Sequence, residues 1–249
     1  MRLALVLALG ACSFRTNPLA APPSDGAADG SDAADIDAAG DARMTDGRMI
    51  DAPPPFCDPS DTTLIACYEF ENTTDDASGH NLNASNTGVT YVTGKAGNAA
   101  HADGTTQMNV AENALLDPPA ITIEAWIRAP IPATGRAGIV DNDGQYGFFL
   151  QPGGALQGIG LTSTANVPAN TWTHVALTYD GTTRHYVNGV QVAVTAGGGA
   201  PLGTGGTTGI SIGADNPPGN GSPLDGDIDQ LRIFSVARTP EQIAADATP

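Results

Sequence analysis

Basic residues are scarce in this sequence, and lysine is almost absent. Its 249 residues contain 10 Lys and Arg, of which only Lys95 is a lysine, against 27 Asp and Glu, for a formal net charge of −17. Such a chain repels phosphate groups instead of releasing their counterions, so its composition excludes nucleic-acid binding by charge. Glutamate is also scarce, whereas Gly and Pro number 31 and 19. Because Gly costs about 1 kcal/mol per helix position, this composition excludes a helical bundle and favours a turn-rich β protein.

Sequence motifs for common catalytic and metal chemistry are missing as well. No Cys-x-x-Cys pair occurs and the four histidines are scattered, so we expect no transition-metal site. No Gly-x-Ser-x-Gly motif occurs, and the Gly-rich stretch 197–209 lacks the Gly-Lys-Ser/Thr of a phosphate-binding loop. We therefore expect no catalytic residues and a chain that is not an enzyme.

The N-terminus has the pattern of an export signal. A basic residue precedes an apolar run over residues 3–9, which is too short to cross a membrane, since a span needs roughly 20 residues. Leu9-Gly10-Ala11-Cys12 resembles the lipobox of bacterial lipoprotein signal peptides. The resemblance implies removal of residues 1–11, acylation of Cys12 and anchoring in a membrane, with the outer membrane or cell surface of a Gram-negative bacterium as the expected location. The alternative is an ordinary secretory signal with a chance cysteine.

Residues 12–56 have the composition of a disordered tether. Within them, residues 18–56 carry eight Asp and two Arg and almost no Val, Leu or Ile. Such a stretch cannot bury enough apolar surface to offset the entropy lost on ordering. After Cys12, the chain has two further cysteines, Cys57 and Cys67, and in an exported protein we expect these two to form a disulfide.

The remainder, residues 57–249, is expected to fold as one antiparallel β-sandwich. Short β-like runs are separated by Gly, Pro, Asn and Asp, and in 121–127 the apolar residues alternate strictly with polar or aromatic ones. Asn188-Gly189 predicts a tight hairpin, and Thr239-Pro240-Glu241-Gln242 is a capping box that predicts a short helix over 240–246. The strands are predicted over 64–70, 121–128, 147–151, 156–162, 172–179, 184–187, 191–195, 209–213 and 228–234.

An ordered series of motifs resembles laminin-G-like domains, which are concanavalin A-like lectin/glucanase jelly rolls. The motifs that carry the resemblance are Ala66-Cys67-Tyr68-Glu69-Phe70-Glu71, Gly94-Lys95-Ala96-Gly97-Asn98-Ala99, Ile123-Glu124-Ala125-Trp126-Ile127, Trp172-Thr173-His174-Val175-Ala176-Leu177, and Gly226-Asp227-Ile228-Asp229-Gln230-Leu231. The resemblance implies an all-β, two-sheet antiparallel jelly-roll sandwich with a short C-terminal helix. Ala102 departs from the pattern, because the family usually places a large aromatic residue before Asp103-Gly104.

Asp229 suggests a structural Ca²⁺ ion. In the strand pattern 228–234 it shares a face with Leu231 and Ile233, so we expect it to point inward, where an unpaired carboxylate is costly. Ca²⁺ is a natural partner in a chain with few basic residues. The family resemblance implies such an ion near the first and last strands, with Asp76 as a second ligand. Alternatively, Asp229 binds backbone amides or Arg232.

The expected function is binding, because the resemblance implies glycan recognition or adhesion. Candidate ligand-binding residues are Trp126, Trp172 and Tyr146, the last of which we expect in an exposed loop. The partner would be a glycan or a surface protein. A protein-interaction or envelope-scaffold module without a sugar site is the alternative. A glycoside hydrolase is a minor one, since laminarinase-like relatives need Glu-x-Asp-x-x-Glu on one strand and no such motif occurs here.

Overall fold

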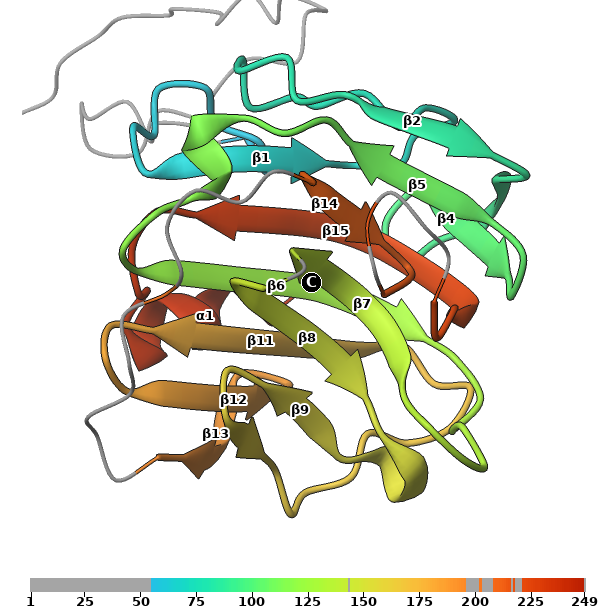
Figure 1. Ribbon diagram of the computed structural model, residues 1–249, viewed down its shortest axis with the longest axis vertical. Helices are drawn as coiled ribbons and strands as arrows, with labels where there is room; N and C mark the ends of the chain where they lie inside the picture. The colour runs from blue at the N-terminus through green and yellow to red at the C-terminus, as the bar shows by residue number, and fades with distance from the viewer. Residues whose placement is uncertain are drawn as a thin grey trace, which may run out of the picture. The chain divides into compact units, whose positions relative to one another are not determined.

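A computed structural model describes residues 55–142, 144–195, 202, 208–215, 217 and 221–248 (Figure 1). The predicted signal peptide, the lipidation site Cys12 and nearly all of the predicted tether therefore lie outside the described residues. Within the described part, no helix is both long and apolar enough to cross a membrane.

Two antiparallel sheets form a sandwich, and Figure 1 shows the second sheet in front of the first. In the first sheet the order is β13 (Val190–Val194), β12 (Thr183–Val187), β11 (Thr173–Tyr179), β6 (Ile121–Arg128), β15 (Asp225–Phe234), β4 (Asn98–Asp103) and β3 (Thr90–Thr93), with β1 (Leu64–Tyr68) also paired to β15. In the second sheet it is β10 (Leu161–Thr162), β9 (Leu156–Gly158), β8 (Tyr146–Leu150), β7 (Ala137–Asn142), β14 (Ile210–Ile212), β5 (Gln107–Val110) and β2 (Ala84–Thr87).

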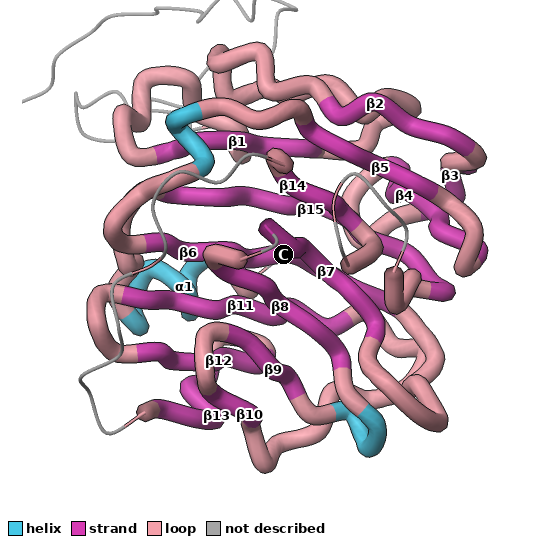
Figure 2. The backbone as a smooth tube through the Cα atoms, in the orientation of Figure 1, coloured by secondary structure: helices cyan, strands magenta, loops and turns pink. Residues whose placement is uncertain are grey.

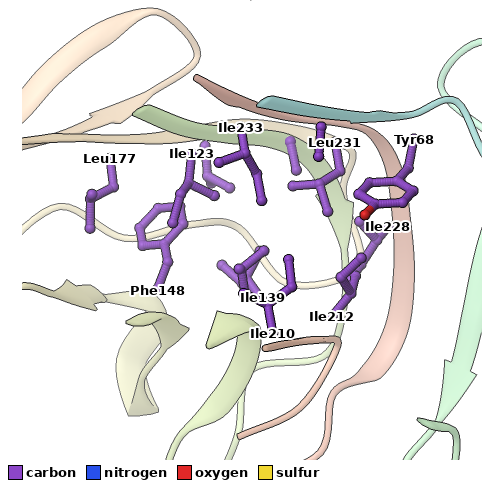
Figure 3. Close-up of a cluster of buried hydrophobic side chains, with 14 of the residues drawn as sticks. Tyr68, Ile123, Ile139, Phe148, Leu177, Ile210, Ile212, Ile228, Leu231 and Ile233 are labelled. Atoms are coloured by element: carbon purple, nitrogen blue, oxygen red, sulfur yellow. The ribbon is translucent and has the colours of Figure 1, made fainter. Parts of the chain in front are cut away.

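The core lies between the inner faces of the two sheets. Because side chains alternate along a strand, β6 and β15 send Ile123 and Ile233 inward, where they face Phe148 and Ile139 of the second sheet (Figure 3). All four side chains are fully buried. Burying apolar surface, at about 25 cal/mol per Å², is the main force that holds the sheets together. The architecture confirms the predicted two-sheet jelly-roll sandwich.

Local sequence signals determine the helix and the hairpin. The α-helix α1 (Pro240–Asp246) begins after Thr239, whose side chain accepts the N–H of Gln242, and it packs Ile243 against the outer face of the first sheet. Asn188 and Gly189 take φ values of 48° and 76° between β12 and β13, as their hairpin prediction requires. Two 3₁₀ turns, η1 (Ala114–Leu116) and η2 (Pro152–Gly154), lie in loops (Figure 2).

The predicted disulfide is present between Cys57 and Cys67, whose Cα atoms are 5.8 Å apart. It attaches the segment that precedes β1 to the outer face of the first sheet. A cross-link of this loop length stabilises the fold by about 2–3 kcal/mol in the chain-entropy model.

Candidate functional site

Three neighbouring strands place a basic residue, an acidic residue and a histidine side by side on the outer face of the first sheet. Asp227 of β15 is in register with His101 of β4 and with Arg128 of β6. The carboxylate accepts from Arg128 Nε at 2.7 Å and from His101 Nδ1 at 2.8 Å. With Nδ1 as the donor, Nε2 of a neutral His101 is left as an acceptor. The trio therefore presents both donors and acceptors at the sheet surface.

These side chains border a cavity of about 340 Å³ at the end of the sheet. Its lining residues are His101, Arg128, Pro130, Asn170, Asp225, Gly226 and Asp227. Arg128 and His101 are about one-third exposed, at 35% and 36% of their side chains, so ligands can reach them from solvent. A cavity of this size, with several polar side chains around it, is typical of a site that binds a small ligand.

Trp172 lies beside this cavity. Its ring is 4.8 Å from the guanidinium carbon of Arg128, and it follows the lining residue Asn170 by two positions. The side chain is half-buried, and the residue directly precedes β11 instead of lying within it as predicted. A partly exposed indole beside convergent polar groups is the arrangement on which a sugar ring can stack while its hydroxyl groups are bound.

The other two predicted aromatic candidates do not reach solvent. Trp126 is 6% exposed, with its ring 4.3 Å from the Lys95 ammonium and edge-on to His174, so it packs on the outer face of the sheet. Tyr146 was predicted in an exposed loop, and that prediction is wrong: it is 4% exposed in β8. The strand continues one residue further toward the turn than the sequence pattern indicated. Trp172 alone of the three remains a candidate.

The prediction that Asp229 shares a face with Leu231 and Ile233 is also wrong. A β-bulge interrupts β15 between Asp229 and Arg232, where Gln230 adopts φ 48°. The extra residue turns Asp229 to the outer face, opposite Trp126, while Leu231 stays in the core. There Asp229 is 0% exposed, and its Oδ2 accepts the backbone N–H groups of Lys95 at 2.7 Å and Ala96 at 3.0 Å. These bonds to backbone amides are the alternative that the sequence left open.

Of the two predicted calcium ligands, donors of the protein occupy Asp76 fully and Asp229 only at its Oδ2, since the Oδ1 of Asp229 is buried without a hydrogen-bond partner among the described residues. Asp76 accepts four hydrogen bonds, from the N–H groups of Cys67, Ser78 and Leu82 and from the Ser78 hydroxyl. A carboxylate has about four lone-pair positions, so this side chain does not fit a calcium ligand. Among the described residues, no three His, Cys, Asp or Glu side chains are grouped so that they could hold a metal ion. The calcium site stays a prediction without support from these contacts.

A larger cavity of about 560 Å³ lies on the same face, between the segment before β1, the Lys95 turn and the end of α1. Its aromatic walls are Phe56 and Phe234, and the guanidinium groups of Arg232 and Arg238 lie over them at 4.3 Å. Arg232 and Arg238 both pair with Asp246. Each of these rings is faced by a guanidinium, as the Trp172 ring is by Arg128, and both guanidinium charges are paired within the protein.

The one glutamate of β6 lies under α1, away from solvent. Glu124 is 1% exposed, with its Oε1 2.6 Å from Arg232 Nη2 and its Oε2 3.8 Å from His174 Nε2. Burial raises the pKa of Glu124 to about 7 against the opposing effect of the Arg232 guanidinium. Burial likewise lowers the pKa of His174 to about 4. A substrate cannot reach this pair, so its role is structural.

Comparison with known families agrees with this geometry. A laminin G-type family model, described as the concanavalin A-like lectin/glucanases superfamily, matches residues 102–244, more than half of the chain. The chain belongs to the concanavalin A-like lectin/glucanase superfamily. A search of the curated proteins found no match to this chain.

Solved structures with the same fold include domain 4 of a GH43 extracellular arabinanase from Geobacillus stearothermophilus, in complex with arabinotriose. It is 25% identical, with a TM-score of 0.62, over 75% of this superfamily member and 98% of that domain. The binding domain of Paraclostridial mosquitocidal protein 1 is 18% identical, with a TM-score of 0.62, and the match spans 74% of this chain and about half (52%) of that one. A Trypanosoma rangeli sialidase matches at 14% identity and a TM-score of 0.57, over 74% of this chain and 32% of that one.

Proposed function

We propose that this domain binds carbohydrate, without cleaving it, in the cavity formed by His101, Arg128 and Asp227 beside Trp172. The observation that carries the proposal is a cavity lined by a guanidinium, an imidazole and a carboxylate, with a half-buried indole lying against that guanidinium. Hydroxyl groups of a sugar both donate and accept, which matches this mixed set. The arabinanase domain that holds arabinotriose, on the same fold, supports a saccharide as the ligand.

The hydrogen bonds that Asp227 already accepts favour binding over catalysis. Hydrolysis of a glycosidic bond requires two carboxyl groups that are available to the substrate, one as acid and one as nucleophile or base. Both oxygens of Asp227 accept hydrogen bonds, from Arg128 and from His101, and the remaining carboxylate of the cavity is Asp225. One available carboxylate can hold a sugar hydroxyl, but it cannot supply both roles of a glycosidase.

The domain is further proposed to be displayed on a bacterial surface by a lipid anchor at Cys12. The lipobox-like Leu9-Gly10-Ala11-Cys12 and the acidic stretch that follows it support this proposal. Metabolic labelling with a palmitate analogue tests it: label should enter the full chain and be lost in Cys12→Ala. Equal labelling of both proteins would contradict acylation at this residue.

A glycan array probed with the purified full chain tests carbohydrate binding. Trp172→Ala should lose the signal, because it removes the stacking surface, while Trp126→Phe should retain it, because Trp126 is buried. Binding that survives Trp172→Ala would move the site elsewhere. If no glycan binds, a protein partner becomes the better candidate, as the toxin binding domain bound to rat synaptotagmin II on this fold suggests.

A further inference from the structure

The cavity beside Arg128 carries more carboxylates than the one guanidinium can pair with. Asp227 is balanced by Arg128, but Asp225 lines the same cavity, is exposed, and has no hydrogen-bond or ion-pair partner among the described residues. Asp103 of β4 is directly opposite Asp225 in the strand register. Two carboxylates, those of Asp225 and Asp227, therefore line this cavity together with one guanidinium and the imidazole of His101, and a third, that of Asp103, stands opposite Asp225 on the neighbouring strand.

Asp103 is ionised at neutral pH. Its Oδ1 accepts the hydroxyl and the N–H of Thr105 and the hydroxyl of Thr106, and these bonds lower its pKa to about 2. Like charges directly opposite each other in a β-ladder oppose the pairing of their strands. The Asp103–Asp225 pair thus costs stability, and among the described residues neither carboxylate has an ion-pair partner that offsets the repulsion.

We propose that Asp225, reinforced by Asp103, makes this cavity selective for neutral saccharides and repels those that carry carboxylate or sulfate groups. The inference rests on the proposed function, since it names the substrate class of the same site. An unpaired carboxylate is a strong acceptor for sugar hydroxyls, whereas an anionic group brought within a Debye length of two such carboxylates is repelled. Arg128 does not compensate, because its charge is already paired with the carboxylate of Asp227, which accepts its Nε at 2.7 Å.

The local charge can be measured without any sugar, by quenching the fluorescence of Trp172. Trp126 is buried, so collisional quenchers should reach Trp172 alone of the two tryptophans, and Trp172→Phe should abolish most of the quenching. At low ionic strength, iodide should quench the wild-type chain less than neutral acrylamide does. Asp225→Asn should raise iodide quenching about twofold and leave acrylamide quenching unchanged, as expected for loss of one charge within a Debye length.

The matched control is Asp180→Asn, which makes the same change in net charge at an exposed position at the opposite end of β11. It should not alter iodide quenching. Two results would show the inference to be wrong even if the domain binds carbohydrate. One is that iodide quenches the wild-type chain as efficiently as acrylamide does, and the other is that Asp180→Asn changes iodide quenching as much as Asp225→Asn does.

Binding measurements then test the selectivity on ligands. On an array of matched neutral and acidic glycans, the wild-type chain should bind neutral members only, and Asp225→Asn should gain binding to acidic members while losing affinity for neutral ones. An acidic glycan bound as tightly as its neutral counterpart overturns the selectivity but leaves the proposed function intact. Absence of all binding refutes the proposed function, and the quenching result still decides whether the cavity repels anions.

Discussion

At the scale of single residues, His185 shows what burial does to a titratable group. Its imidazole is 0% exposed on the inner face of β12, with its ring centre 5.7 Å from that of Phe148. Burial disfavours the charged form and lowers the pKa of His185 from its ordinary 6.5 to about 4. The folded state therefore holds His185 neutral at pH values where the unfolded chain already binds a proton.

This residue makes the fold sensitive to acid. The unfolded state binds a proton at His185 that the folded state does not. The contribution of neutral His185 to the unfolding free energy is therefore fully present above pH 6.5 and is lost as pH falls from 6.5 toward 4. At about 1.4 kcal/mol per pH unit, the loss reaches at most about 3.5 kcal/mol. His185→Leu should show a smaller fall in unfolding free energy over this range, measured by urea denaturation at pH 7 and pH 4.5. An equal fall in both proteins would assign the acid sensitivity to other groups.

Two buried carboxyl groups have the opposite effect on stability in acid, because they make the folded state more stable as pH falls. Burial raises the pKa of Glu124 to about 7 and that of Asp229 to about 6, so the folded state binds these protons while the unfolded state has released them. Their contributions rise as pH falls from about 7 toward 4. The wild-type stability curve should therefore be shallower than His185 and His174 alone would make it.

At the scale of elements, the bulge in β15 determines which side chains face the core and which build the outer face. Gln230 holds φ 48°, a left-handed conformation that costs an L-residue roughly 1–2 kcal/mol. Without the bulge, the strict period of two would keep Asp229 on the face of Leu231. The strained residue therefore lets Asp229 bind the Lys95 turn instead of entering the core.

Substitutions at position 230 test this role. Gln230→Gly should change the unfolding free energy by less than about 1 kcal/mol, because relief of strain offsets the added freedom of the unfolded chain. Gln230→Val should lower it by about 2 kcal/mol or more, because a β-branched residue is poorly tolerated at positive φ. Chemical denaturation of both variants measures the difference, and equal stabilities would contradict an enforced bulge.

The same bulge marks how far the sequence alone could predict this domain. Strands with strong alternation, such as β6, and elements with their own turn chemistry, such as the Asn188-Gly189 hairpin and α1, were predicted almost to the residue. Strands β2 and β4, rich in Ala, Asn, Ser and Thr, were missed because they carry little apolar signal. Strands β3, β5 and β7 were missed as well, because each holds only two or three apolar residues in a run too short to show a period.

The candidate site was only partly predictable for a related reason. Trp172 was identified from its residue type, but the trio of His101, Arg128 and Asp227 was not, because it depends on the register of three strands that lie far apart in the chain. His101 lies in β4, one of the missed strands. Pairing Asp227 with Arg128 required the adjacency of β15 and β6, which no local pattern reveals.

At the scale of the whole molecule, the two faces of the first sheet differ in what they contact. The inner face forms the core, while the outer face carries, in successive rows, the polar cavity at Arg128, the buried Trp126–His174 contact and the Glu124–Arg232 pair covered by α1. In the first of these rows, Arg128 and His101 are about one-third exposed. A domain built in this way can bind a ligand at the end of one sheet without disturbing its core.

Isothermal titration of the purified full chain with its best glycan from the array tests the central claim most directly. We predict saturable binding by the wild-type chain and at least tenfold weaker binding by Trp172→Ala, a loss of about 1.4 kcal/mol or more, at an unchanged melting temperature. Equal affinity of the two proteins, or no heat of binding with any saccharide, would contradict carbohydrate recognition at the Arg128 cavity.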